Sequence, residues 1–152
     1  MKTETPILDF QVDFYGPMED YIEFPENLTI AYKGYLDFMN NPKGSCETLS
    51  EYSCMLFPTC WQGEGFPGVI IDAYVAGLPV IATDWNMNKE VVEDGKTGII
   101  VPAQDSIALA LAMLKVMENP EMIETMSQNS LNKAEDFHID AVWPQIEYIL
   151  NN

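Results

Sequence analysis

Residues 54–83, CMLFPTCWQGEGFPGVIIDAYVAGLPVIAT, decide the fold of this chain. The stretch begins with four apolar residues that stop at Pro58, a pattern typical of a short buried strand. A loop with several glycines follows, and then a mostly apolar helix with Pro67 in its first turn and Gly77 at its end. Residues 78–82 read as the next buried strand. A strand, a helix and a strand within about 30 residues predict a parallel β-α-β unit.

The sequence on either side extends this pattern. Upstream, residues 8–15 and 28–32 are expected to be strands, 18–25 a short helix or a loop, 40–44 a turn and 46–52 a short helix. Downstream, residues 84–88 are a loop, 89–92 a helical turn, 93–98 a tight turn and 99–101 a strand. Strands that alternate with helices predict an α/β fold with a mainly parallel, Rossmann-like sheet.

Three helices are expected in the C-terminal third. Asp105 is the predicted N-cap of the first, over 106–118, with an apolar face made by Ile107, Leu111 and Leu114. Asn119 is the predicted cap of the second, which starts at Pro120. The third covers about 139–149. The single histidine, His138, stands at a helix junction and is expected to be a cap or a surface residue.

Composition limits the classes of function. The chain has 152 residues, of which 47% are hydrophobic, enough for one domain over 1–152 with its own core. A formal net charge of −17 argues against nucleic acid and anionic membrane surfaces as partners, because both repel it. The three cysteines lack the spacing of a zinc site, and the N-terminus lacks the apolar segment of a signal peptide. A cytoplasmic location without a bound metal fits these features.

The loop before the central helix has the chemistry of an anion site. Unpaired backbone N–H groups and the positive end of the helix dipole are expected near residues 66–69, and both favour a phosphate or diphosphate. Glu64 stands just before the helix, and Asp72, eight residues later, can accept hydrogen bonds from a second pair of hydroxyl groups. An anion site with two carboxylates suits a nucleotide-sugar. Glycine-rich loops before helices are common, so these residues alone leave other ligands, or none, open.

Four runs in this region resemble the donor-binding domain of retaining, two-domain glycosyltransferases of family 4 (glycosyl transferases group 1). They are 57–59 (FPT), 64–68 (EGFPG), 77–83 (GLPVIAT) and 90–98 (EVVEDGKTG), in the order of that family. The resemblance weakens before Cys54 but continues through 14–17 (FYGP) and 33–36 (KGYL). It implies the C-terminal half of a GT-B fold. Residues 84–88 (DWNMN) depart from the family's Gly-Gly loop, which leaves their role open.

The resemblance also implies roles for individual residues. Glu64 matches the catalytic acid that contacts the donor sugar, and Asp72 matches the acid that binds ribose hydroxyls, with a side chain one methylene shorter than the usual glutamate. The other expected substrate-binding residues are Gly65, Phe66, Pro67, Gly68 and Val69 at the sugar and diphosphate, and Tyr35 and Leu36 at the nucleobase. The implied substrates are a UDP- or GDP-sugar and a glycan or lipid-linked acceptor. The family needs no metal bound to the fold and no further cofactor.

Two parts of such an enzyme are expected to be missing. One is the acceptor-binding N-terminal domain, which would also bring peripheral contact with the inner membrane face. The other is the first strand of the donor domain, with the arginine and lysine that neutralise the diphosphate; Lys2 is the only basic residue among the first seven. Because that strand is central in a doubly wound sheet, strand 8–15 is expected either to pair with strand 54–57 or to leave an edge that a partner chain or a second copy covers.

Three classes of function follow. The first is a glycosyltransferase donor-binding domain, active in retaining sugar transfer for polysaccharide biosynthesis. The second is a truncated or split glycosyltransferase that is inactive without a partner chain. The third is another nucleotide-binding enzyme, such as a dehydrogenase or an epimerase, which would require a G-x-G-x-x-G motif after the first strand; the sequence has none.

Overall fold

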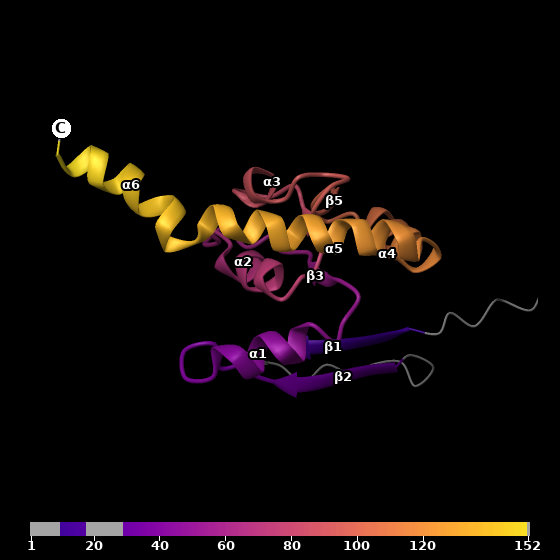
Figure 1. Ribbon diagram of the computed structural model, residues 1–152. Coiled ribbons are helices and arrows are strands. Elements are labelled where there is room, and N and C mark those ends of the chain that lie inside the picture. Colours follow the sequence, from indigo (N-terminus) through magenta and orange to yellow (C-terminus); the bar gives the residue numbers. More distant parts are fainter. Residues whose placement is uncertain (1–9, 18–28, 152) are drawn as a thin grey trace, which may run out of the picture. The chain divides into compact units, whose positions relative to one another are not determined.

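The computed structural model describes residues 10–17 and 29–151, which group into two compact units (Figure 1). The first unit ends at Pro42 and the second begins at Lys43. That residues 1–152 form one partial domain stays a prediction. The expected short helix or loop at 18–25 and any strand within the first six residues lie outside the described residues.

The first unit contains two parallel strands. β1 (Gln11–Tyr15) pairs with β2 (Thr29–Gly34), and Gln11 lies opposite Thr29. Beyond the strand ends, the Gly16 amide donates to the Gly34 carbonyl at 2.7 Å. Both strands are confirmed within the described residues: β1 ends at Tyr15 as predicted, and β2 ends at Gly34, two residues later than predicted.

α1 (Pro42–Leu49) begins earlier than the sequence predicts. The expected turn at 40–44 and the expected helix at 46–52 are replaced by one helix that starts inside the turn cluster. Pro42 is compatible with this start because its fixed φ suits the first helical position and its missing N–H would have no partner there. Ser45 and Leu49 are its buried residues.

The second unit is built on a three-stranded parallel sheet with the order β3-β4-β5. β3 (Met55–Phe57) and β5 (Gly98–Val101) flank β4 (Val80–Thr83), whose four residues are all buried. α2 (Gly68–Val75) connects β3 to β4, and the short α3 (Asn88–Val91) lies between β4 and β5. The predicted β-α-β unit is confirmed.

Gly77 ends α2 as the sequence predicts. Its φ of +74° is a left-handed conformation that glycine adopts without strain. The Gly77 amide donates to the Tyr74 carbonyl at 2.9 Å, and the Leu78 amide donates to the Ala73 carbonyl at 2.8 Å. These two bonds form a Schellman motif, which satisfies the last carbonyl groups of the helix and turns the chain into β4.

α4 (Ser106–Glu118) is capped as predicted but packs through a different face. The Asp105 carboxylate accepts hydrogen bonds from the amides of Ile107 and Ala108 at 3.1 and 2.9 Å. Ile107 and Leu111, however, are 72% and 61% exposed, so the predicted apolar face is wrong. The helix instead buries Ala112 and Val116 in one cluster with Ile81 and Val101. Apolar residues occur on two sides of α4, so periodicity alone does not select the side that meets the sheet.

α5 (Pro120–Ala134) packs beside α2, and the short helix η1 (Glu135–Phe137) connects it to α6 (Ile139–Leu150) (Figure 1). Asn119 is the N-cap residue of α5 and Pro120 its first residue, as predicted, although the Asn119 side chain makes no cap bond to α5. Its amide Nδ2 donates to the Lys115 carbonyl at 2.7 Å and so closes the end of α4. His138 is confirmed as a cap, with Nδ1 accepting from the Asp140 amide at 3.4 Å.

The expected pairing of strand 8–15 with strand 54–57 stays a prediction, because the two strands belong to different units. β1 takes β2 as its parallel partner, and β3 pairs only with β4. β3 is therefore an edge strand of the described sheet, and all three of its residues are half-buried. Whether another chain covers this edge stays a prediction. Across residues 10–17 and 29–151, no helix combines the length and apolar character needed to cross a membrane.

Candidate functional site

The loop from Pro58 to Pro67 leaves the carboxyl edge of the parallel sheet, where open α/β sheets bind their ligands. A tight turn forms within it, because the Glu64 amide donates to the Trp61 carbonyl at 3.1 Å. Pro67 is buried and occupies the N-cap position, so α2 begins one residue later than predicted, at Gly68. The loop therefore delivers Glu64 to the start of α2, as the sequence suggests.

The expected unpaired amides are only partly present at this helix start. The Gly68 amide donates to the Phe66 carbonyl at 2.9 Å, and Pro67 has no N–H to offer. Among the described residues, the amides of Gly65, Phe66 and Val69 donate no hydrogen bond. These three N–H groups, close to the positive end of the α2 dipole, are the donors that remain for an anion.

Glu64 is half-buried, and its carboxylate accepts one hydrogen bond. Its carboxylate Oε2 accepts from the Thr59 hydroxyl at 3.4 Å. The Thr59 carbonyl in turn accepts from the Thr83 hydroxyl at 2.5 Å, which attaches this loop to the end of β4. The second carboxylate oxygen has no partner among the described residues, so Glu64 retains acceptor capacity for a ligand hydroxyl.

Asp72 lies in the middle of α2 and is also half-buried. Burial raises the pKa of its carboxyl group above the ordinary value. Burial, and then the charge of Asp72, raise the pKa of the Cys46 thiol, so Asp72 acts electrostatically on α1. No hydrogen bond joins Asp72 to Glu64 in the described part of the chain. That the two acids bind one ligand stays a prediction.

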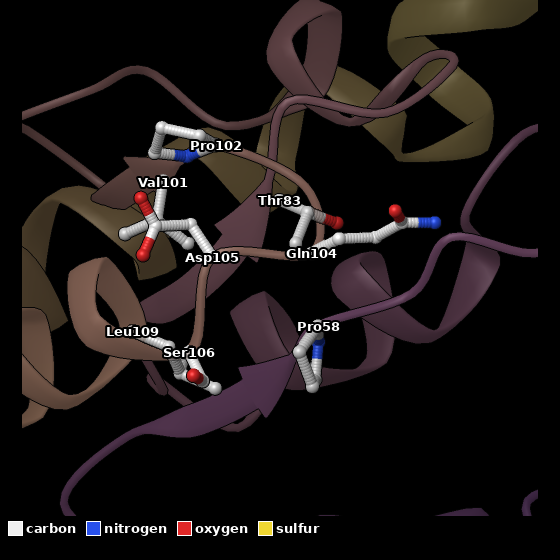
Figure 2. Close-up of a pocket in the computed structure, with 8 residues that line it drawn as sticks. All are labelled: Pro58, Thr83, Val101, Pro102, Gln104, Asp105, Ser106 and Leu109. Carbon is white, nitrogen blue, oxygen red and sulfur yellow. The ribbon is translucent and has the colours of Figure 1, made fainter.

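A cavity of about 200 Å³ opens at the same carboxyl edge of the sheet (Figure 2). It lies where β3, β4 and β5 end and α4 begins. The residues that line it are Pro58, Thr83, Val101, Pro102, Gln104, Asp105, Ser106 and Leu109. The sequence did not predict this cavity. Pro58 and Pro102, each of which directly follows a strand, were the signal that could have indicated it.

Residues 3–119 match the family model described as glycosyl transferases group 1. The chain belongs to this glycosyl transferase family. A relative from Staphylococcus aureus, the capsular polysaccharide biosynthesis glycosyltransferase CapM, is 31% identical over 132 residues, which are 81% of this chain and 34% of CapM. The phosphatidyl-myo-inositol mannosyltransferase of Mycobacterium leprae is 42% identical over 62 residues, which are 41% of this chain and 17% of the relative.

Solved structures agree on the fold. A sucrose-phosphate synthase from Thermosynechococcus elongatus matches with a TM-score of 0.69 and 24% identity, over 81% of this chain and 30% of the neighbour. Anabaena Alr3699/HepE, solved in complex with UDP, matches with a TM-score of 0.70 and 21% identity, over 81% of this chain and 32% of the neighbour. The α/β fold of the GT-B class is thereby confirmed. The glycosyl transferase chain spans about a third or less of the length of these relatives.

Two of the predicted substrate-binding residues lie in the first unit. Tyr35 and Leu36 follow β2 directly; Tyr35 is exposed and Leu36 is half-buried. Their role at a nucleobase stays a prediction. Across the part of the chain that the structure describes, no three His, Cys, Asp or Glu side chains gather in a way that could hold a metal ion.

The segment 84–88, whose role the sequence leaves open, contacts the Glu64 loop of the glycosyl transferase. The Trp85 indole Nε1 donates to the Trp61 carbonyl at 2.8 Å. The Asn86 side chain donates through Nδ2 to the Glu64 carbonyl at 2.7 Å. Sequence reasoning missed both residues, because each bond spans more than 20 positions and has no local signature. The only available signal was the departure from the family's Gly-Gly loop.

Proposed function

We propose that this chain provides the donor site of a retaining glycosyltransferase that moves a sugar from a UDP- or GDP-sugar to a glycan or lipid-linked acceptor. The observation that carries the proposal is the placement of Glu64 next to the three unpaired amides of Gly65, Phe66 and Val69. The relatives named above, which act in capsular polysaccharide and phosphatidylinositol mannoside chemistry, support the same class of reaction. Alr3699/HepE, solved with UDP and with UDP-glucose, supports UDP as the nucleotide.

Each group has a defined task in this proposal. The amides and the dipole of α2 bind the diphosphate and stabilise the charge that develops on it as it leaves. Glu64 accepts hydrogen bonds from donor-sugar hydroxyls and orients the sugar. Asp72 accepts from ribose hydroxyls, directly or through a water. In the transfer, the bond from the anomeric carbon to the diphosphate oxygen breaks, the acceptor hydroxyl forms the new bond, and the acceptor proton is released.

A second candidate is a non-catalytic fragment or one half of a split glycosyltransferase. The half-buried edge strand β3 favours it, because an unpaired edge is a surface that another chain or a second copy can cover. The acceptor site would then belong to the partner, which would act in the cytoplasm and at the inner membrane face. In either case the loop from Pro58 to Pro67 itself carries no arginine or lysine that could neutralise a diphosphate.

Isothermal titration calorimetry of the purified chain with UDP-glucose, UDP-N-acetylglucosamine and GDP-mannose tests both candidates. Two charge-assisted bonds are worth roughly 1.5–3 kcal/mol each, so their absence is expected to weaken binding by about a hundredfold or more. Glu64→Gln is expected to weaken binding of the sugar-linked nucleotide while leaving binding of the free nucleoside diphosphate unchanged. Glu118→Gln makes the same charge change at an exposed position on α4 and serves as the control.

The outcomes separate the candidates. Weak, Glu64-dependent binding of one nucleotide-sugar supports the donor site. Tight binding by the chain alone contradicts the argument from the missing cations. Absence of binding to every donor counts against a self-sufficient site and favours the split enzyme, whose partner is then sought by repeating the titration after co-expression with the product of the adjacent open reading frame.

A further inference from the structure

Two neighbouring side chains hold the loop that carries Glu64. Trp85 and Asn86 follow β4 after Asp84, and each donates one hydrogen bond to a backbone carbonyl of the loop between β3 and α2. The acceptors are the carbonyl oxygens of Trp61 and Glu64, which are the first and last residues of the tight turn. The segment 84–88 therefore contacts the turn at both of its ends.

The Trp61 carbonyl closes the turn and receives Trp85 at the same time. It accepts from the Glu64 amide at 3.1 Å and from Trp85 Nε1 at 2.8 Å. Gly63 lies inside this turn against the Trp61 ring, and a Cβ at that position would overlap the ring carbons. The turn is therefore compact, and the Trp61 carbonyl that closes it also accepts the hydrogen bond from Trp85.

Asn86 acts on a single peptide group. The carbonyl of Glu64 and the N–H of Gly65 belong to one planar, trans peptide, so they point in opposite directions. Asn86 Nδ2 donates to that carbonyl at 2.7 Å, which directs the Gly65 N–H away from the segment 84–88. The Gly65 N–H is one of the three amides that donate no bond among the described residues. A hydrogen bond to the carbonyl also polarises the peptide and makes its N–H a stronger donor.

The segment itself is firmly held. The Trp85 amide donates to the Thr83 carbonyl at 2.8 Å, and the Asn88 amide donates to the Trp85 carbonyl at 3.0 Å. The fully buried Asn88 side chain donates through Nδ2 to the same Thr83 carbonyl at 3.0 Å. Asn86 has a φ of +45°, a left-handed conformation that asparagine tolerates better than most residues. This backbone geometry brings the Asn86 amide to the Glu64 carbonyl.

We propose that Trp85 and Asn86 are positioning residues that hold the turn from Trp61 to Glu64 and aim the Gly65 N–H at the donor diphosphate. This inference rests on the proposed function for the identity of the ligand, but the restraint on the turn is a property of the chain without ligand. The two hydrogen bonds thereby give a role to the segment 84–88, which departs from the family's Gly-Gly loop.

Amide hydrogen exchange of the full chain, measured residue by residue by NMR, tests the restraint without any ligand. Trp85→Phe keeps an aromatic ring and removes the Nε1 donor, and Asn86→Gly keeps the backbone conformation and removes the amide. Each variant is expected to speed exchange of the Glu64 amide about threefold to tenfold, the factor that corresponds to one lost hydrogen bond. Lys89→Gln is the matched control, because it removes the ion pair of Lys89 with Asp84 and leaves the donors of Trp85 and Asn86 in place.

Exchange of the Glu64 amide at the wild-type rate in both variants would overturn the proposal. So would an equal increase across β4 and α2, which would mean that the two residues act only on overall stability. Titration of UDP-glucose into each variant tests whether the restraint affects donor binding. Both variants are expected to bind UDP-glucose about threefold to tenfold more weakly than the control. If the wild-type chain binds no UDP-glucose while exchange of Glu64 rises in the variants, the proposed function fails for this donor and the restraint stands.

Discussion

The hydroxyl groups of Tyr74 and Thr97 lie 2.7 Å apart in the buried interior of the second unit. This contact joins α2 to the turn before β5. The Tyr74 hydroxyl also donates to the Val91 carbonyl at 3.3 Å, and the Thr97 hydroxyl oxygen accepts from the Glu93 amide at 3.0 Å. A buried polar pair of this kind links the helix that begins at the candidate site to two segments that follow β4.

Tyr74→Phe is expected to lower the free energy of unfolding by about 1–3 kcal/mol, because it removes two buried hydrogen bonds, to the Val91 carbonyl and the Thr97 hydroxyl. Urea unfolding followed by circular dichroism measures the change. Tyr32→Phe is the matched control: its hydroxyl donates to the Gly16 carbonyl at an exposed position, where water replaces the lost bond. Equal, small changes in the free energy of unfolding for the two variants would contradict the prediction, because the buried bond would then contribute no more than the exposed one.

Gly98→Ala is expected to destabilise the sheet by about 1–3 kcal/mol, the usual range for overpacking a tight site. A Cβ at Gly98 would overlap the backbone carbonyl oxygen of Val80 on the neighbouring strand, and backbone atoms cannot move away as a side chain can. Gly68→Ala, at the start of α2, meets no atom within 4 Å and is expected to be tolerated. Thermal unfolding of both variants checks the contrast, and a stable Gly98→Ala protein would contradict it.

Stability is expected to fall in acid through Glu93. Hydrogen bonds from Lys133, and then from Lys96, hold the pKa of Glu93 below its ordinary value of 4.5. A carboxyl group with a lowered pKa in the folded chain stabilises it above the ordinary pKa, and this contribution is lost as the pH falls through the folded-state pKa. Because the Glu93 side chain is 41% exposed and water screens its ion pairs, the contribution is small, about 0.2–1 kcal/mol.

Urea unfolding at pH 7 and at pH 3 measures this contribution. Glu93→Gln is expected to lose stability at pH 7 and little at pH 3, so its loss on acidification is smaller than that of the wild type. Glu118→Gln, at an exposed position without an ion pair among the described residues, is the control. A pH profile of Glu93→Gln that parallels the wild type would rule out this contribution.

The three cysteines are expected to differ in reactivity. Burial raises the pKa of Cys54 to about 11, and Cys60 is exposed in the loop before Glu64. Because the thiolate is the nucleophile, Cys54 is expected to resist iodoacetamide at pH 8 while Cys60 is alkylated. Peptide mass spectrometry after timed labelling measures the order, and labelling in urea should make all three reactive. Alkylation of Cys54 as fast as Cys60 in the folded chain would contradict the burial.

Local features of the sequence predicted much of the fold. The end of α2 at Gly77 and the cap of α4 at Asp105 follow from residues within one turn of the helix end. The buried face of α4 and the side-chain bond of Asn119 did not follow, because each depends on which neighbouring groups are in reach. The same limit applies to the segment 84–88, whose bonds to the Glu64 loop join residues distant in sequence.

The sequence by itself determined the β-α-β unit, the family and the position of Glu64 before a helix, since these depend on short apolar runs, on turn residues and on a motif read in order. Only the tertiary structure decided which amides at the start of α2 remain unpaired and which side chains hold the loop. The loop is held by hydrogen bonds from the segment 84–88, more than 20 residues away in sequence, and the chain must fold before such groups meet.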